Sequence, residues 1–203
     1  MNEWIFFWVD VVGIGAFALS GYLAAVKHRL DWLGIFLIAF LTALGGGILR
    51  DLMTDVVPYA FREVYPALTV VVVTVSALVF RLHRYGFDRH NLFIMTDAVG
   101  LSSFAITGVL AAWSAELNPI AVLLIALITA VGGGMIRDVL LNRVPTILTS
   151  GFYGSLAILI GLAMLLIDFV AAFNHFAALC VLVAAVTLRL IAVRHNWKLP
   201  VPQ

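Results

Sequence analysis

The sequence predicts an all-α integral membrane protein: seven transmembrane helices, arranged as two inverted three-helix repeats plus a seventh helix. Three observations lead to this fold class: the composition, the spacing of the apolar stretches and an internal repeat. Of the 203 residues, 64% are hydrophobic and 11% are charged, whereas soluble domains are roughly 45–50% apolar and about 25% charged. The formal net charge of +1 and the lack of a long charged tail argue against a nucleic-acid partner.

Seven apolar stretches approach the length of about 20 residues that a helix needs to cross a bilayer. The connections between them are short and contain loop or helix-start residues such as Pro58, Asn118 and Pro145. We therefore expect a single membrane domain over residues 1–203, with repeat one at about 4–82, repeat two at about 91–169 and the seventh helix at about 173–193. The predicted spans are 4–26, 33–54, 62–82, 92–113, 119–141, 150–169 and 173–193.

The first span does not resemble a cleaved signal peptide, and we expect it to be retained. Such a peptide needs a basic stretch before its apolar core, and this chain has Asn2 and Glu3 there instead. The span also carries Asp10, and it recurs later in the chain. The residues that end the spans include tryptophans, which are typical of membrane–water interfaces: Trp4, Trp8, Trp32, Trp113 and Trp197.

The distribution of basic residues predicts the orientation, because cytoplasmic loops are rich in Lys and Arg. One set of loops and ends contains nine basic residues, whereas the opposite set contains only Arg62. We therefore expect the N-terminus outside, the C-terminus in the cytoplasm and the chain in the cytoplasmic membrane. The nine residues are Lys27, Arg29, Arg81, Arg84, Arg89, Arg143, Arg189, Arg194 and Lys198.

An internal repeat relates the two halves of the chain. Shifting the sequence by 87 residues places 10–58 on 97–145 without a gap, and 22 of these 49 positions are identical. A unit of three spans crosses the membrane an odd number of times, so its second copy must enter from the opposite side. The identical polar and special residues pair as Asp10 with Asp97, Gly13 with Gly100, Gly21 with Gly108, Thr42 with Thr129, Gly45, Gly46 and Gly47 with Gly132, Gly133 and Gly134, Arg50 with Arg137, Asp51 with Asp138, and Pro58 with Pro145.

A triple glycine lies within the second span (Gly45–Gly47) and another within the fifth (Gly132–Gly134). Each glycine costs about 1 kcal/mol relative to alanine inside a helix, so three together predict an interrupted helix whose free carbonyls face a hydrated cavity. The alternative is close packing of two helices. We favour the interruption because packing motifs usually place glycines four residues apart rather than next to each other.

Charged residues follow each glycine triplet within the span. Arg50 and Asp51 recur as Arg137 and Asp138, and charges within a membrane usually face the protein interior or water and serve function. Neighbouring residues on a helix point in different directions, so we expect partners from other helices, across the pseudo-two-fold axis, rather than neutralisation within each pair. A structural ion-pair network and snorkelling of the arginines towards the interface are the alternatives.

Further polar residues lie in the spans. Asp10 and Asp97, one to two turns into the first and fourth spans, would line a polar pathway. For Asp97 the alternative is a carboxylate near a helix N-terminus, where the helix dipole favours it. Hydroxyl groups either line such a pathway or bond to their own backbone, which is the commoner fate. These hydroxyls belong to Thr42, Thr129, Ser20 and Thr107.

The sequence contains no pattern typical of an enzyme or of a metal site. The five histidines lie near span ends without metal-ligand spacing, and Cys180 is the single cysteine. No nucleophile elbow or phosphate-binding loop is present. We therefore expect no catalytic residues, no bound metal and no cofactor.

The doubled Gly-Gly-Gly-x-x-Arg-Asp motif, each copy followed by proline seven residues later, resembles the prokaryotic members of the trimeric intracellular cation (TRIC) channel family. The same duplicated domain occurs in bacterial putative glycine transporters. The resemblance implies a homotrimer with one pathway for monovalent cations, chiefly potassium, inside each subunit. By motif match, the second and fifth spans would line that pathway.

Two hypotheses for function follow. The first is a passive channel for K⁺ or Na⁺, in which backbone carbonyls, threonine hydroxyls and carboxylates replace the hydration shell of the ion and Arg50 and Arg137 gate or tune the field. The second is a carrier for a small zwitterion such as glycine, with arginine holding its carboxylate and aspartate its amine. Membrane lipid is the other expected partner. The same residues serve both schemes, so the sequence does not separate them.

Overall fold

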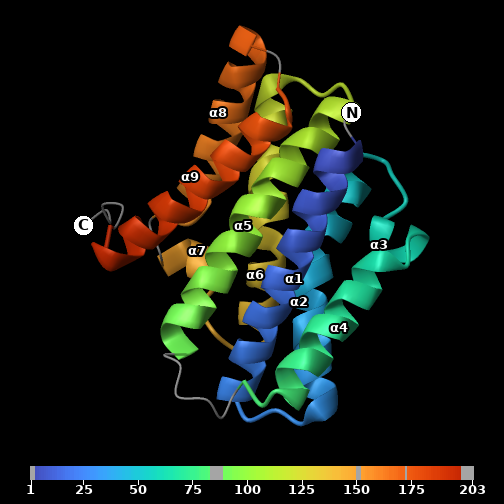
Figure 1. The fold of residues 1–203 in the computed structure, drawn as a ribbon, viewed down its shortest axis with the longest axis vertical. Coiled ribbons are helices and arrows are strands. Elements are labelled where there is room, and N and C mark those ends of the chain that lie inside the picture. The colour runs from blue at the N-terminus through green and yellow to red at the C-terminus, as the bar shows by residue number, and fades with distance from the viewer. Residues whose placement is uncertain (1–2, 83–88, 150–151, 172, 198–203) are drawn as a thin grey trace.

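The computed structural model describes residues 3–82, 89–149, 152–171 and 173–197, and these segments form helices without any strand. Figure 1 shows the helices, coloured along the chain from blue to red. Their bounds are α1 Glu3–Lys27, α2 Trp32–Met53, α3 Tyr59–Arg62, α4 Tyr65–Val79, α5 Arg89–Ser114, α6 Pro119–Leu140, α7 Thr146–Thr149, α8 Gly154–Ala171 and α9 His175–Arg194.

A helix occupies each of the seven predicted spans. Five of them, α1, α2, α5, α6 and α9, are long and apolar enough to cross a membrane, and α4 and α8 are shorter apolar helices. Large apolar side chains such as Leu33, Val79 and Phe169 are exposed on the outside, as a lipid-facing surface requires. The prediction of an all-helical, multi-pass membrane protein is confirmed. The sequence did not predict the two short helices α3 and α7.

Polar residues fix where several helices begin. The Asp31 side chain accepts a hydrogen bond of 2.7 Å from the Gly34 backbone N–H before α2. Asn118, 87 residues later, accepts from the N–H groups of Ile120 and Ala121 before α6, at 3.1 Å each. Side chains in this position satisfy backbone donors that the first helical turn leaves free. The repeat is therefore accompanied by matching helix starts.

Four helices form the centre of the molecule. The helix α1 packs against α5, and α2 packs against α6, while α1 with α2 and α5 with α6 are also neighbours. The outer helix α4 lies against α1 and α2, whereas α8 lies against α5 and α6. Figure 1 shows α4 on one flank of this centre and α8 and α9 on the other. The helix α9, which has no counterpart in the repeat, contacts α5 and α8.

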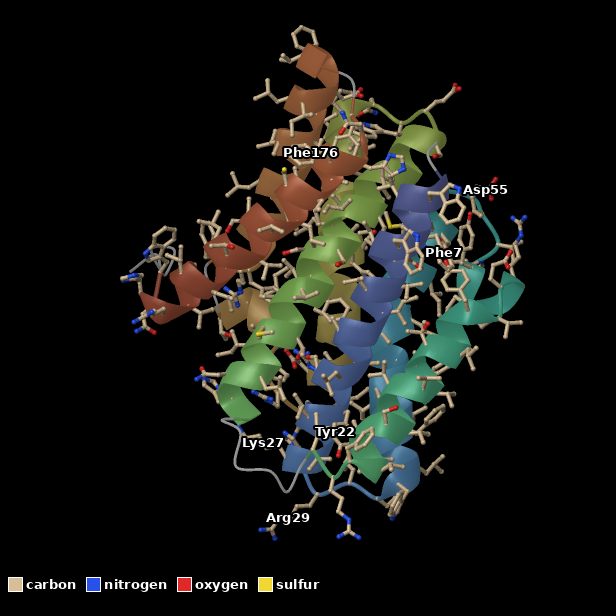
Figure 2. All side chains as sticks on the ribbon, viewed as in Figure 1. Phe7, Tyr22, Lys27, Arg29, Asp55 and Phe176 are labelled. Carbon is tan, nitrogen blue, oxygen red and sulfur yellow. The ribbon has the colours of Figure 1, made fainter. Side chains whose placement is uncertain are left out.

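The chain directions of the two repeats can be compared at their first helices. The helices α1 and α5, the first of each repeat, run in opposite directions in Figure 1. Lys27 and Arg29 lie at one end of the helical bundle, whereas Phe7 and Asp55 lie near the other (Figure 2).

Arg189, counted among the basic residues of loops and span ends, lies five residues before the end of α9, and its side chain is buried in the protein. Two other residues of the basic set, Arg84 and Lys198, lie outside the described residues.

The predicted interruption at the glycine triplets is wrong. Helix α2 continues through Gly45–Gly47 and α6 continues through Gly132–Gly134. An interruption would leave carbonyl groups without partners at membrane depth, which costs several kcal/mol for each group. Keeping the helix costs about 1 kcal/mol for each glycine, so the continuous helix is the better solution.

The glycines bring α2 and α6 into backbone contact, which is the alternative that the sequence left open. A Cβ atom on Gly46 would collide with the carbonyl oxygen of Thr129, and one on Gly133 would collide with the carbonyl oxygen of Thr42. The two helices can therefore approach this closely only because both positions lack a side chain. Neighbouring glycines serve packing here because each triplet meets the other across the crossing.

A pair of phenylalanines fills the space beside this crossing. Phe17 and Phe104, which are 87 residues apart, meet edge to face with ring centroids 5.2 Å apart, and both are buried. A Cβ on Gly13 would overlap Phe104, and one on Gly100 would overlap Phe17. The small residues of α1 and α5 thus admit the aromatic rings of the opposite helix, so the centre of the bundle is tightly packed.

Candidate functional site: two buried charged clusters

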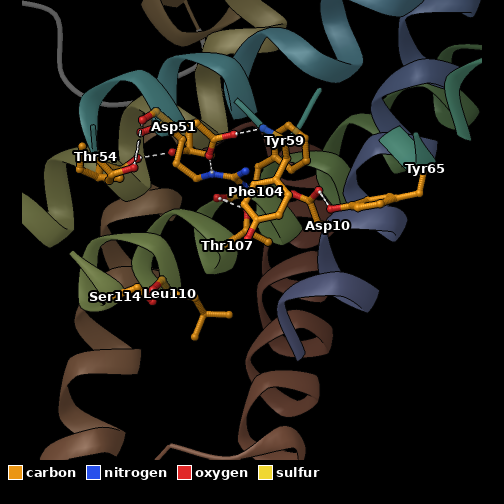
Figure 3. A network of polar contacts seen from close by, with 12 residues as sticks. Asp10, Asp51, Thr54, Tyr59, Tyr65, Phe104, Thr107, Leu110 and Ser114 are labelled. Carbon is orange, nitrogen blue, oxygen red and sulfur yellow. Dashed lines mark hydrogen bonds and ion pairs between the residues drawn. The ribbon is translucent and has the colours of Figure 1, made fainter. Parts of the chain in front are cut away.

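The first charged cluster consists of Asp10, Arg50, Asp51, Tyr65 and Thr107 and is shown in Figure 3. The Arg50 guanidinium donates from Nη1 to Asp10 Oδ1 and to the Thr107 hydroxyl, both at 3.0 Å. From Nε it donates to Asp51 Oδ1 at 2.7 Å. All three of these charged residues are buried. The cluster joins α1, α2, α4 and α5.

The remaining carboxylate oxygens of the first cluster also have partners. Asp51 Oδ2 accepts a 2.9 Å hydrogen bond from the Tyr59 backbone N–H, the first residue of α3, so this carboxylate holds the short helix in place. Asp10 Oδ2 accepts a 3.1 Å hydrogen bond from the Tyr65 hydroxyl of α4. Figure 3 shows both contacts as dashed lines. Charge-assisted hydrogen bonds of this kind are stronger than neutral ones.

The second charged cluster, which consists of Ser20, Asp97, Arg137, Asp138 and Thr146, repeats this arrangement. Arg137 donates from Nη1 to Asp97 at 2.7 Å and to the Ser20 hydroxyl at 2.7 Å, and from Nε to Asp138 at 3.0 Å. Asp138 Oδ2 accepts from the Thr146 backbone N–H, which begins α7, at 2.9 Å. The Thr146 hydroxyl also donates to it at 2.8 Å.

Each cluster takes one hydroxyl from the other half of the chain. Arg50 belongs to the first repeat and bonds Thr107 in the second, whereas Arg137 belongs to the second repeat and bonds Ser20 in the first. Ser20 and Thr107 are themselves 87 residues apart. Partners from other helices were predicted for both arginines, and these contacts agree with that prediction. Neither half of the chain contains a complete cluster on its own.

The expectation that Arg50 and Asp51 would not pair with each other is wrong, and the same holds for Arg137 and Asp138. Their Cβ atoms do point in different directions. The long arginine side chain folds back, however, so that Nε reaches the neighbouring carboxylate while Nη1 reaches another helix. Each guanidinium therefore bridges two carboxylates.

One contact of each cluster was missed by the sequence analysis. The Phe6 ring lies 4.8 Å from the guanidinium carbon of Arg50, and the Phe93 ring lies at the same distance from that of Arg137. A buried guanidinium over an aromatic face is stabilised by the ring quadrupole. Phe6 and Phe93 are 87 residues apart, so extending the self-alignment upstream of Asp10 would have found them.

Two of the predicted threonines, Thr42 and Thr129, bond to their own backbone, whereas Thr107 also bonds Arg50. The hydroxyls of Thr42 and Thr129 donate to the carbonyl oxygens of Ile38 and Ile125 one turn earlier, at 2.6 Å each. Both side chains are fully buried, and each lies beside the glycine of a neighbouring helix, Gly21 or Gly108. Backbone bonding is thus the alternative that these hydroxyls adopt.

A small cavity lies beside the first cluster. Its volume is about 10 Å³, near the smallest that can hold one water molecule. Within the described segments, no group of three or more His, Cys, Asp or Glu residues is placed to hold a metal ion. The cavity is lined in part by Asp10, Gly47, Arg50, Asp51, Tyr59 and Pro66.

Comparison with known proteins places the chain in a family. The model of the domain described as "Glycine transporter" matches residues 7–83 and 94–169, two segments that begin 87 residues apart. The UPF0126 inner membrane protein YadS of Escherichia coli K12 is 34% identical over 200 residues, which cover 96% of this chain and 94% of that protein. A solved prokaryotic TRIC channel has 31% identity and a TM-score of 0.88, covering 97% of this chain and 100% of that one. This chain belongs to the TRIC family.

Another member of the TRIC family has a similar structure. The trimeric intracellular cation channel orthologue of Rhodobacter sphaeroides superposes with a TM-score of 0.86 and 29% identity, covering 95% of this chain and 99% of that one. These solved relatives are named as channels rather than as enzymes. The resemblance to the TRIC family that the doubled motif indicated is therefore confirmed over almost the whole chain.

Proposed function

We propose that this protein is a monovalent cation channel that conducts potassium through a pathway inside each subunit. The observation that carries the proposal is the match over almost the whole chain to solved proteins named as TRIC channels. We extend it to a homotrimer in the cytoplasmic membrane, with the N-terminus outside and the C-terminus in the cytoplasm. The basic residues near span ends support this orientation.

The net charge of the two clusters suits cations. Each contains two carboxylates and one guanidinium, so each has a formal charge of −1 when both carboxylates are ionised. In surroundings of low dielectric constant this charge acts over a longer range than it does in water. A cation entering the protein would be attracted to the carboxylates Asp10, Asp51, Asp97 and Asp138, while an anion would be repelled.

The guanidinium groups occupy the positions that a permeating cation would take. Arg50 lies between the carboxylates of Asp10 and Asp51, and the adjoining cavity of about 10 Å³ has room for about one water molecule. Conduction therefore requires Arg50 and Arg137 to give up part of their contacts to the ion. We assign the gating or field-tuning role to these two arginines, and ion attraction to the four carboxylates.

The glycine-rich helices α2 and α6 form the contact between the two halves of the chain. They carry both arginines immediately after the backbone contact at Gly46 and Gly133. The backbone contact fixes the relative position of the two clusters, and the inverted arrangement places them on opposite sides of this crossing. Thr42 and Thr129 contribute to that contact through their carbonyl oxygens.

The second candidate function is a carrier for a small zwitterion. The description of the matching domain as "Glycine transporter" favours it. Arg50 or Arg137 would then bind the carboxylate of glycine, and a neighbouring aspartate would bind its ammonium group. Alternate exposure of the two clusters would move the solute across the membrane.

A pair of measurements separates these functions. Purified protein in a planar bilayer with a KCl gradient should give unitary currents that reverse near the potassium equilibrium potential. Liposomes containing the same preparation should not accumulate labelled glycine above protein-free liposomes. Saturable glycine uptake without unitary currents would refute the channel and support the carrier.

A further inference from the structure

Among the positions next to the buried arginines, one differs between the halves in the space that its side chain fills. Pro66 and Tyr153 are 87 residues apart and therefore equivalent in the repeat. In the first half, Pro66 lines the cavity beside Arg50 together with Gly47. In the second half, the equivalent of Gly47 is Gly134. The side chain beside Gly134 therefore decides whether the second half has a cavity like the one beside Gly47.

Tyr153 fills the corresponding place in the second half. Its hydroxyl oxygen lies 3.0 Å from the point that a Cβ on Gly134 would occupy, and Arg137 Nη2 lies 3.7 Å from the same point. The Tyr153 side chain is almost completely buried, at 1% exposure. The smaller Pro66 leaves the Gly47 side of Arg50 open, with only Arg50 atoms near Gly47. A tyrosine ring thus takes the place that the cavity has in the first half.

Helix α9 holds this ring in position. The guanidinium carbon of Arg189 lies 4.9 Å from the centroid of the Tyr153 ring. Arg189 Nη1 also donates a 3.3 Å hydrogen bond to the carbonyl oxygen of Phe152, the residue before Tyr153. Arg189 is only 7% exposed, so its contact with the ring is poorly screened by water. The arginine holds both the ring and the backbone that carries it.

We propose that Tyr153 is a plug that closes the second charged cluster to water and ions, and that Arg189 of α9 latches the plug. Displacement of the ring would open a cavity beside Arg137 like the one beside Arg50. The inference rests on the proposed cation pathway and adds its regulation: movement of the helix outside the repeat controls access to one half only. Tyr153 and Arg189 are positioning residues, which act through the cluster around Arg137.

Cysteine accessibility tests the plug without any current measurement. Ala43 lines the first cavity, and Ala130 is its equivalent 87 residues later. In a Cys180→Ser background, Ala43→Cys and Ala130→Cys are treated with 2-aminoethyl methanethiosulfonate in detergent or liposomes, and intact-protein mass spectrometry follows the modification. We expect the thiol at position 43 to react and the thiol at position 130 to resist.

Removing the plug should reverse this resistance. Adding Tyr153→Ala to Ala130→Cys should make the thiol reactive, whereas Tyr153→Phe, which keeps the ring, should leave it protected. Arg189→Met should raise the modification rate by about ten-fold, because it removes the charge that holds the ring. Arg194→Met, at an exposed position of the same helix, is the matched control and should change nothing.

Two outcomes overturn the plug. One is equal reactivity at positions 43 and 130 while Tyr153 is intact, and the other is continued protection at position 130 in both Tyr153→Ala and Arg189→Met. Size-exclusion profiles exclude variants that fail to fold, and Arg189→Met remains informative if Tyr153→Ala is lost. Bilayer recordings should then show a higher open probability for Arg189→Met. Absence of any wild-type current would refute the proposed channel while the thiol data still decide the plug.

Discussion

The two charged clusters have the same charged groups and are equally buried, but different residues pack beside them. Both place an arginine between two carboxylates and beneath a phenylalanine ring, with a hydroxyl from the opposite half. A cavity adjoins the cluster around Arg50, whereas the ring of Tyr153 covers the cluster around Arg137. The repeat has thus kept the charges, whose loss would be costly, and has diverged in the surrounding residues. Four predictions test how far this comparison holds.

The largest effect is expected where both halves meet. Gly133→Ala places a Cβ against the carbonyl oxygen of Thr42, and Gly46→Ala does the same at Thr129. Backbone atoms cannot move aside as side chains do. We therefore expect the free energy of unfolding to fall by about 3 kcal/mol or more, and little protein to fold. Size-exclusion chromatography and thermal unfolding in detergent measure this. Gly47→Ala, whose Cβ would meet only Arg50 at 3.7 Å or more, is the control and should fold; equal behaviour of all three would contradict the backbone contact.

The next effect compares the two guanidinium groups directly. Arg137→Met leaves two carboxylates buried without their cation, which should cost about 3–5 kcal/mol of unfolding free energy. Arg50→Met should cost less, because the adjoining cavity leaves room for about one water molecule beside Asp10 and Asp51. Reversible unfolding in mixed micelles measures both values. A larger loss of unfolding free energy for Arg50→Met would show that the cavity does not lower the cost of burying the carboxylates of its cluster.

The third effect concerns conduction. Asp10→Asn and Asp97→Asn each remove one of the two negative charges of a cluster. We expect the single-channel potassium conductance to fall on the order of ten-fold at low salt, and the difference to shrink at high salt as the charges are screened. Recordings over a range of KCl concentrations measure this. Asp168→Asn, in α8 away from both clusters, should leave the conductance unchanged; unchanged currents in the cluster variants would remove the carboxylates from the pathway.

The smallest effect concerns a contact that only the second half makes. Thr146→Val removes the hydroxyl bond to Asp138 but keeps the backbone bond that begins α7. We expect the free energy of unfolding to fall by about 1 kcal/mol, which is typical of one buried hydrogen bond. Thermal unfolding in detergent measures this. Thr149→Val, whose hydroxyl bonds only within its own short exposed helix, should cost less than half of this. An equal loss in both would indicate a helix-propensity effect rather than the bond to Asp138.

The self-alignment at 87 residues predicted most of what the structure contains. It named the arginines and carboxylates of both clusters and required partners from another helix, because buried charges need counter-charges. It did not predict which groups would meet, since the reach of a long arginine side chain is independent of the direction of its Cβ. The contact of Arg50 with Asp51 is the example.

Other features depend on three-dimensional packing and left little trace in the sequence. We predicted an interrupted helix at Gly45–Gly47 because packing glycines usually lie four residues apart. That spacing belongs to helices that touch along one face of each, whereas here two glycine triplets meet at a single close crossing. The role of Tyr153 depends on a change at a single repeat position, Pro66, which lies beyond the part of the alignment with frequent identities. Arg189 resembled a basic residue at the end of a span, and only the helix placement shows that it points inward.

The exchange of hydroxyls between the halves bears on how such a chain arose. A gene encoding one three-helix unit would have supplied Asp10, Arg50 and Asp51 but no Thr107 for the guanidinium. Its product would have needed a second copy, inserted upside down, to complete the hydrogen bonding. Fusion of two such genes would then have freed each copy to mutate separately, and Pro66 and Tyr153 record that freedom.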